Sequence, residues 1–180
     1  MNKSIVLAVL AMVLLVSSYA QTTGTFKDSR DGKTYKTVKI GNQTWMAENL
    51  AFKTTNAAVS KSNNVEKYGY IYDWEEAKKT CPSGWHLPTK TEFTILLNTY
   101  GVGENAYNAL KDGGLSGFNA LFGGDDTFSY EGGGTCFWTS DQYKTTSGAH
   151  NVMINNTSKI AKFDANNQER GFSIRCIKNK

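Results

Sequence analysis

Glycine is distributed very unevenly along this chain, and that distribution limits the folds open to it. Ten of its 17 glycines lie within one stretch, at positions 101, 103, 113, 114, 117, 123, 124, 132, 133 and 134. Glycine is disfavoured inside helices and strands because it loses the most backbone freedom on folding. We therefore expect this stretch to wrap the surface as long loops. Loops of this kind often carry the binding site of a compact domain.

The first twenty residues have the three parts of an export signal. Lys3 gives a positive start, residues 5–16 form an unbroken apolar run, and Ser18 and Ala20 are small side chains before a cut. The apolar run would span only about 18 Å as a helix, short of the ~30 Å core of a bilayer. We expect a signal peptide over residues 1–20, with a retained membrane anchor as the alternative.

The remaining chain suits a single domain over residues 21–180, with its core at about 24–178. Nothing in it is long and apolar enough to cross a membrane, and Gln21 offers no cysteine for a lipid anchor. We expect a periplasmic, cell-surface or extracellular protein. The formal net charge of +4, which includes Lys3, is too small for a dedicated nucleic-acid binder.

Helix signals are clearest in the middle of the chain. Thr89 and Glu92 form a capping box, and apolar residues follow at helical spacing up to Tyr100, where Gly101 supplies the stop. We expect a helix here whose apolar face packs on a sheet. Shorter helices are expected at residues 74–80 and 104–111.

Strand signals flank these helices. We expect strands at residues 25–27, 34–40, 43–47, 136–140, 149–154, 159–163 and 171–178. A Gly-Asn turn between the second and third strands would set Val38 opposite Trp45. Residues 54–67 are predicted to be a surface loop. Tyr68, Tyr70 and Tyr72 would then share one face of an extended chain, packing a core or offering a platform for a sugar.

Several phrases together resemble one family of exported bacterial proteins. They are DGKTY at 31–35, IGNQTWMAENL at 40–50, YGYIY at 68–72, CPSGWHLPT at 81–89, FWTS at 137–140 and GFSIRC at 171–176. In this order they resemble the Fibrobacter succinogenes major paralogous domain, over roughly residues 24–178. The resemblance implies an α+β, C-type-lectin-like domain with small antiparallel sheets, two helices, long Gly-rich loops and neighbouring chain ends. It implies a fold rather than an activity.

Three cysteines in an oxidising compartment allow one bridge within the chain and leave one thiol over. The lectin-like pattern implies a disulfide between Cys81, beside a helix, and Cys176, in the final strand. The alternative pairs Cys136 with Cys176 as sheet neighbours. Otherwise Cys136 is expected to be a buried thiol.

Aromatic and polar side chains of the loops are the candidates for ligand contact, because aromatic faces ringed by polar groups suit glycans and proteins. These candidates are Asp125, Asp126, Tyr130, Glu131, Trp138, Asp141 and Tyr143. Trp138 could equally be a core residue. We expect no cofactor and no metal. The alternative is calcium held by the carboxylates of Asp125, Asp126 and Glu131, although the motifs of calcium-dependent sugar-binding lectins do not occur here.

These features predict an exported, non-catalytic binding module whose partner is a polysaccharide or a surface protein. One alternative is an enzyme on the formylglycine-generating fold, but that chemistry needs two cysteines close together. Another is a structural component of a cell-surface assembly. Nothing in the spacing ties His150 to Cys136 as a catalytic pair. Arg175 is expected to have a structural role, paired with Glu48 or Asp73.

Overall fold

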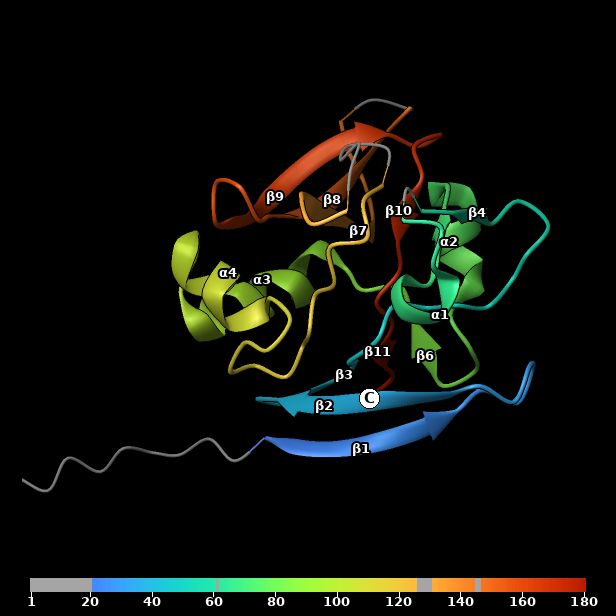
Figure 1. Ribbon diagram of the computed structural model, residues 1–180, viewed down its shortest axis with the longest axis horizontal. Coiled ribbons are helices and arrows are strands. Elements are labelled where there is room, and N and C mark those ends of the chain that lie inside the picture. The colour runs from blue at the N-terminus through green and yellow to red at the C-terminus, as the bar shows by residue number, and fades with distance from the viewer. Residues whose placement is uncertain (1–20, 61, 126–130, 145–146) are drawn as a thin grey trace, which may run out of the picture.

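The computed structural model describes residues 21–60, 62–125, 131–144 and 147–180. The expected signal peptide over residues 1–20 lies outside this part of the chain. The regular elements of the described residues form two sheets and four helices, where the resemblance implied two helices. In Figure 1 the helices α3 and α4 lie between the larger sheet and the ribbon formed by β1 and β2. The combination of antiparallel-rich sheets with few helices agrees with the expected α+β class.

The smaller sheet combines strands from both ends of the described chain with β6 from its middle. Its strands, in the order β1-β2-β3-β11-β6, are β1 (Thr22–Lys27), β2 (Thr34–Ile40), β3 (Gln43–Met46), β11 (Ile177–Lys178) and β6 (Trp85–His86). All neighbours in it are antiparallel. Val38 lies opposite Trp45, which confirms the predicted hairpin register.

The larger sheet has six strands in the order β4-β5-β10-β7-β8-β9. They are β4 (Ala58–Val59), β5 (Tyr70–Tyr72), β10 (Phe172–Ser173), β7 (Gly134–Gln142), β8 (Gly148–Asn155) and β9 (Ile160–Asn167). Its pairs are antiparallel except for one, because β10 runs parallel to β7.

The helices are α1 (Val65–Tyr68), α2 (Trp74–Thr80), α3 (Lys90–Tyr100) and α4 (Glu104–Leu110). The predicted capping box of α3 is present. The Thr89 hydroxyl accepts the Glu92 N–H at 3.1 Å, and the Glu92 carboxylate accepts the Thr89 N–H at 2.8 Å. Local signals therefore locate α2, α3 and α4 to within a residue or so of their observed bounds.

Two predicted elements are wrong in detail. The expected final strand over 171–178 is interrupted: β10 joins the larger sheet and β11 the smaller, and the residues between them cross the core. The expected loop over 54–67 contains β4 and the start of α1. Tyr68 consequently ends a helix and does not share an extended face with Tyr70 and Tyr72.

The disulfide joins Cys81, directly after α2, to Cys176, between β10 and β11, with 5.9 Å between their Cα atoms. This is the pairing that the resemblance implied. Cys176 belongs to a buried core cluster that includes Trp74, Trp138 and Phe172, and the partly buried Cys81 packs against it. Cys136 lies in the same cluster as a buried thiol outside the disulfide. The alternative bridge between Cys136 and Cys176 is therefore not formed.

Arg175 is completely buried where the chain crosses between the sheets. Its guanidinium donates to Asn49 Oδ1 at 2.6 Å, to the carbonyls of Met46 and Asn119 at 3.2 and 3.1 Å, and to the carbonyl of Phe118. The predicted ion pair with Glu48 or Asp73 is wrong, because neutral carbonyl oxygens surround the charge instead. Burial lowers the pKa of Arg175 to about 9, so the side chain is still a cation at neutral pH.

Candidate functional site

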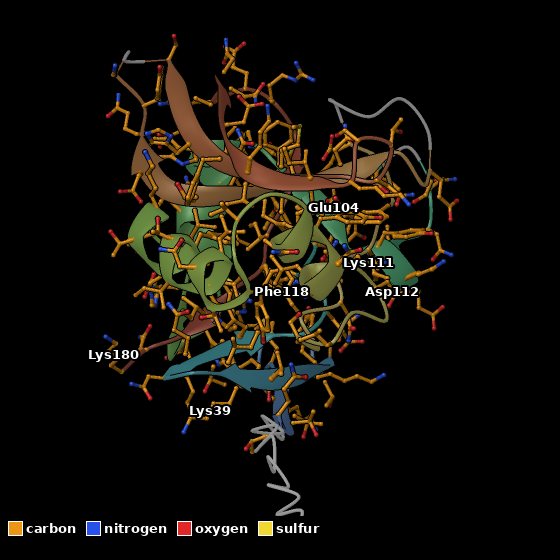
Figure 2. All side chains as sticks on the ribbon, turned by 90° about the vertical axis from the view of Figure 1, so that its left-hand side faces the viewer. Lys39, Glu104, Lys111, Asp112, Phe118 and Lys180 are labelled. Carbon is orange, nitrogen blue, oxygen red and sulfur yellow. A yellow bond between two sulfur atoms is a disulfide. The ribbon has the colours of Figure 1, made fainter. Side chains whose placement is uncertain are left out.

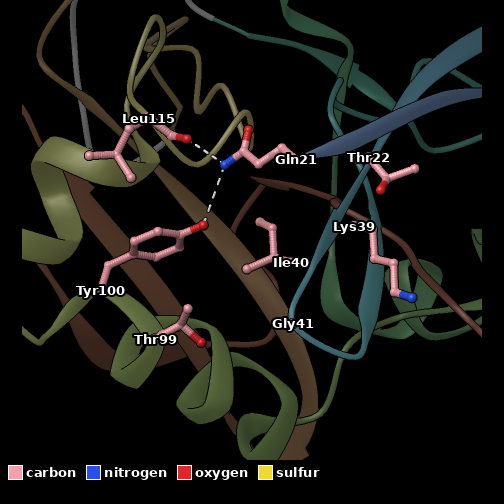
Figure 3. Close-up of a pocket in the computed structure, with 8 residues that line it drawn as sticks. All are labelled: Gln21, Thr22, Lys39, Ile40, Gly41, Thr99, Tyr100 and Leu115. Carbon is pink, nitrogen blue, oxygen red and sulfur yellow. Dashed lines mark hydrogen bonds between the residues drawn. The ribbon is translucent and has the colours of Figure 1, made fainter. Parts of the chain in front are cut away.

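A cavity of about 490 Å³ lies where the β1–β2 ribbon meets the end of α3. A volume of this size is within the range of small-molecule sites. The residues that line it, drawn in Figure 3, come from four separate parts of the chain: Gln21, Thr22, Lys39, Ile40, Gly41, Thr99, Tyr100 and Leu115.

Local structure sets the walls of this cavity. Gly41 has a φ of 57°, in the left-handed region that suits glycine, and so the tight turn between β2 and β3 forms at one side. The last turn of α3 supplies Thr99 and Tyr100 on another side. Leu115, from the Gly-rich stretch, stands at the rim and is 73% exposed.

The side chains of Gln21, Ile40 and Tyr100 converge in Figure 3, whereas those of Thr22 and Lys39 point away. This follows from strand geometry, since successive side chains face opposite sides of a sheet. Figure 2 likewise shows Lys39 projecting from the outer side of the ribbon. The side chains that converge on the cavity are therefore neutral, while Lys39 belongs to its lining with its ammonium directed away (Figure 3).

Hydrogen-bonding capacity is left over inside the cavity. The Gln21 amide nitrogen donates to the Tyr100 hydroxyl at 3.5 Å and to the Leu115 carbonyl. Tyr100 is thus an acceptor in that bond and keeps its own hydrogen to donate. Burial raises the pKa of Tyr100 and the Gln21 bond only partly offsets this, so the hydroxyl is protonated at neutral pH. The Thr99 hydroxyl donates to the Ile95 carbonyl at 2.9 Å and can still accept.

A second cavity, of about 460 Å³, lies further along the same ribbon. It is lined by Thr23, Gly24, Thr25, Lys36, Thr37, Val38, Ala47, Gly117 and Asn119. Thr23 is paired with Val38 and Thr25 with Lys36, directly after the pair of Thr22 and Lys39. The two cavities are therefore neighbours between the ribbon and the loop that follows α4.

Two of the predicted ligand-contact residues are buried and have structural roles. Trp138 is completely buried and donates its indole N–H to the Tyr72 carbonyl at 2.8 Å, so the expected surface contact is wrong for this residue. Asp125 is also completely buried, and its carboxylate accepts the Cys136 N–H at 2.7 Å. Both side chains hold loops and strands together.

The other predicted residues do not form a single site. Glu131 is exposed, accepts from the Tyr68 hydroxyl and lies 3.9 Å from the Lys67 ammonium. Asp141 is half-buried and accepts the Lys90 N–H at the start of α3, at 2.6 Å. Tyr143 packs edge-on against His150 and borders a shallow cavity of about 220 Å³ beside β8 and β9.

Asp126 and Tyr130 lie outside the described residues, so the expected acidic trio cannot be assembled in full. Within the part of the chain that the structure describes, no group of three or more His, Cys, Asp or Glu side chains is arranged to hold a metal ion. Asp125 and Glu131 are each engaged with protein groups, as described above.

None of the residues predicted for ligand contact lines this cavity, and of its lining only Leu115 lies in the predicted loop region. Leu115 lies in the Gly-rich stretch that was expected to carry the binding site, and Tyr100 had been assigned to the apolar face of α3. Gln21 was recognised only as the expected first residue after export. The three meet through contacts that span 79 and 94 residues of sequence, for which no local pattern exists.

Comparison with known proteins gives one result. A family model described as the Fibrobacter succinogenes major domain matches residues 38–178. No curated protein matches the chain, and no solved structure does. The matched range includes Tyr100 and Leu115 but begins after β1 and the first half of β2.

Proposed function

Because the chain belongs to the Fibrobacter succinogenes major domain family, we propose that it is an exported, non-catalytic binding module that holds a carbohydrate in the cavity beside Tyr100. The scaffold is a C-type-lectin-like domain. This proposal rests on the cavity, on the disulfide and on the arrangement of the two sheets.

The lectin-like assignment is supported by how the ends of the chain meet. The first strands and β11 share the smaller sheet, so both ends of the domain contribute to one sheet. The disulfide fastens the end of α2 to the segment before β11, across 95 residues of sequence. Long Gly-rich segments separate α4 from β7.

The observation that carries the carbohydrate proposal is the chemistry of the cavity wall. Hydroxyl and amide groups of Tyr100, Thr99 and Gln21 stand beside the apolar side chains of Ile40 and Leu115. Sugars present hydroxyl groups and apolar C–H faces, and such a wall can satisfy both. The lining residues include no Asp, Glu, His or Cys to act as acid, base or nucleophile.

Export is supported by the disulfide, because such bonds persist in oxidising compartments. Among the described residues, no helix is long and apolar enough to span a membrane. The expected signal over residues 1–20 completes the proposal.

Two observations argue against the formylglycine-generating alternative. The disulfide occupies Cys81 and Cys176, and Cys136 is wholly buried. While the disulfide is formed, the chain therefore has no pair of reactive cysteine thiols. A protein partner remains the second candidate, since the exposed Leu115 offers an apolar contact beside the cavity.

The test is a glycan array probed with protein purified after export, followed by titration of the best ligand. Tyr100→Phe removes one hydroxyl donor and should weaken binding about threefold to tenfold, the range expected for one neutral hydrogen bond. Tyr143→Phe is the matched control, because Tyr143 lies at the shallow cavity beside β8 and β9. An array with no bound glycan, or a loss confined to Tyr143→Phe, would refute the proposal.

A further inference from the structure

Gln21 directly precedes β1, and its side chain is held by distant parts of the fold. We propose that this residue is a modification site: after export it cyclises to pyroglutamate, and the contacts of the cavity wall hold that reaction in check. The inference rests on the export that is part of the proposed function, because removal of residues 1–20 gives Gln21 a free α-amine. It does not require the cavity to hold a carbohydrate.

The cyclisation uses only the groups of the residue itself. The α-amine nitrogen attacks the carbon of the side-chain amide, a new C–N bond closes a five-membered lactam, and the bond from that carbon to Nε2 breaks. Nε2 takes up the proton that the amine gives up and leaves as ammonia, so the step needs no oxidant, reductant or second substrate. An α-amine is a weaker base than a lysine amine, so part of it is uncharged and nucleophilic at neutral pH. The product has neither an amino-terminal charge nor a side-chain amide donor.

Nε2 of Gln21, the leaving group of that reaction, is bound by two distant segments. It donates to the Leu115 carbonyl in the loop after α4, and to the Tyr100 hydroxyl at the end of α3 at 3.5 Å. Figure 3 shows the amide nitrogen of Gln21 between these two groups. Cyclisation must break both bonds, because the nitrogen that makes them leaves the molecule.

Gly117 packs against the other end of the same amide. A Cβ atom at this position would lie 2.6 Å from Gln21 Oε1 and 3.2 Å from Val38 Cγ2, so the loop backbone lies close to the amide oxygen. Because Gly117 has no side chain, the amide fits between the loop and the ribbon. The amide carbon cannot turn back onto its own α-nitrogen without leaving these contacts, and we therefore expect the folded state to slow the reaction.

Cyclisation would also change the cavity, since Gln21, Tyr100 and Leu115 all line it. The loss of Nε2 removes a donor that ties the start of β1 to α3 and to the loop after α4. Chain ends that are not tied down in this way are commonly poorly ordered. The exported protein therefore has two chemical forms with different cavity walls, and the fold favours the open form.

The test follows the loss of ammonia from Gln21 while the exported protein is stored at neutral pH. Mass mapping of the amino-terminal peptide assigns the loss to this residue and identifies the first residue of the chain. The same protein kept unfolded in guanidinium chloride is the reference. We expect cyclisation to be slower in the folded protein by about tenfold or more, the factor expected when two hydrogen bonds must break first.

Gly117→Ala tests whether the packed loop is the cause. The added methyl group would meet the free end of the Gln21 side chain and displace it, so cyclisation should be about threefold to tenfold faster than in the parent protein. Gly113→Ala is the matched control, because Gly113 lies in the same loop with a φ of 69°, against 62° for Gly117, and a Cβ there meets nothing within 4 Å. Both substitutions carry the strain of a left-handed backbone, and circular dichroism checks that both variants are folded. Tyr100→Phe, which deletes one acceptor of Nε2, is the second variant, with Tyr143→Phe as its control.

Cyclisation that is slow in the folded parent protein, and faster in each variant than in its control, supports the inference. Equal rates in the folded and unfolded parent overturn it, and so do variants that cyclise no faster than their controls. A first residue other than Gln21 overturns both the inference and the expected cut after Ala20. A glycan array without a bound ligand refutes the carbohydrate proposal and leaves the cyclisation result unaffected.

Discussion

The buried hydroxyl of Tyr35 makes the stability of the fold depend on pH. It is wholly buried on β2, and its hydroxyl accepts the Ala51 N–H at 3.1 Å. Burial raises its pKa to about 12, against 10.0 for an ordinary tyrosine. Tyr72 also has a pKa raised by burial, and its hydroxyl donates to the Phe52 carbonyl at 2.7 Å.

We therefore expect the stability of the protein to fall between pH 10 and pH 12. In this window the folded state keeps the Tyr35 proton that the unfolded chain releases, so the contribution is complete below pH 10 and is lost as pH rises to 12. The slope is about 1.4 kcal/mol per pH unit for one such group. Tyr35→Phe should flatten this slope in urea unfolding measured across the window. Arg175, whose pKa is lowered by burial, contributes a stability that rises with pH. This contribution is the same in the parent protein and in the variant, so it does not affect the comparison. An unchanged slope would contradict the assignment.

Helix α3 illustrates what a short segment encodes by itself. Its capping box, its apolar face and its terminal glycine are all local features, and they appear in the structure as the spacing predicts. The Glu92 carboxylate also accepts from the His86 ring at 3.0 Å, which ties the helix start to β6. The helix then delivers Tyr100 to the candidate site.

Removing the N-cap of α3 should lower the free energy of unfolding more than a substitution at a nearby exposed position does. Thr89→Ala deletes the oxygen that accepts the Glu92 N–H and should lower the free energy of unfolding by about 1 kcal/mol. Thr91→Ala changes an exposed threonine on the same helix and should stay within about 0.5 kcal/mol of the parent protein. Urea unfolding of both variants provides the comparison. Equal losses would show that the cap contributes nothing specific.

At the scale of the whole molecule, the disulfide and the crossing segment around Arg175 hold the two sheets together. Cys176 lies next to Arg175, so one short segment carries the covalent link and the buried cation. The carbonyl groups that surround the cation come from β3 and from the loop after α4. The same loop lines the second cavity along the ribbon through Gly117 and Asn119.

Replacement of both Cys81 and Cys176 by alanine should lower the free energy of unfolding by about 2–5 kcal/mol, because the closed loop is long. Thiol titration in denaturant without reductant should detect a single thiol per chain, that of Cys136. The matching control is the same titration after reduction, which should detect three. Three thiols before reduction would exclude the bridge.

The sequence alone determined the features that depend on neighbours along the chain: helices α2 to α4, the register of Val38 with Trp45, and, through the family resemblance, the disulfide. Tertiary structure alone decided the features that depend on packing. It split the last strand between two sheets, buried Trp138 and Asp125, and surrounded Arg175 with carbonyl groups. It also brought Gln21, Tyr100 and Leu115 to one cavity. Caps and turns are stabilised within a few residues, whereas a cavity wall exists only once distant segments have packed, and so no local pattern encodes it.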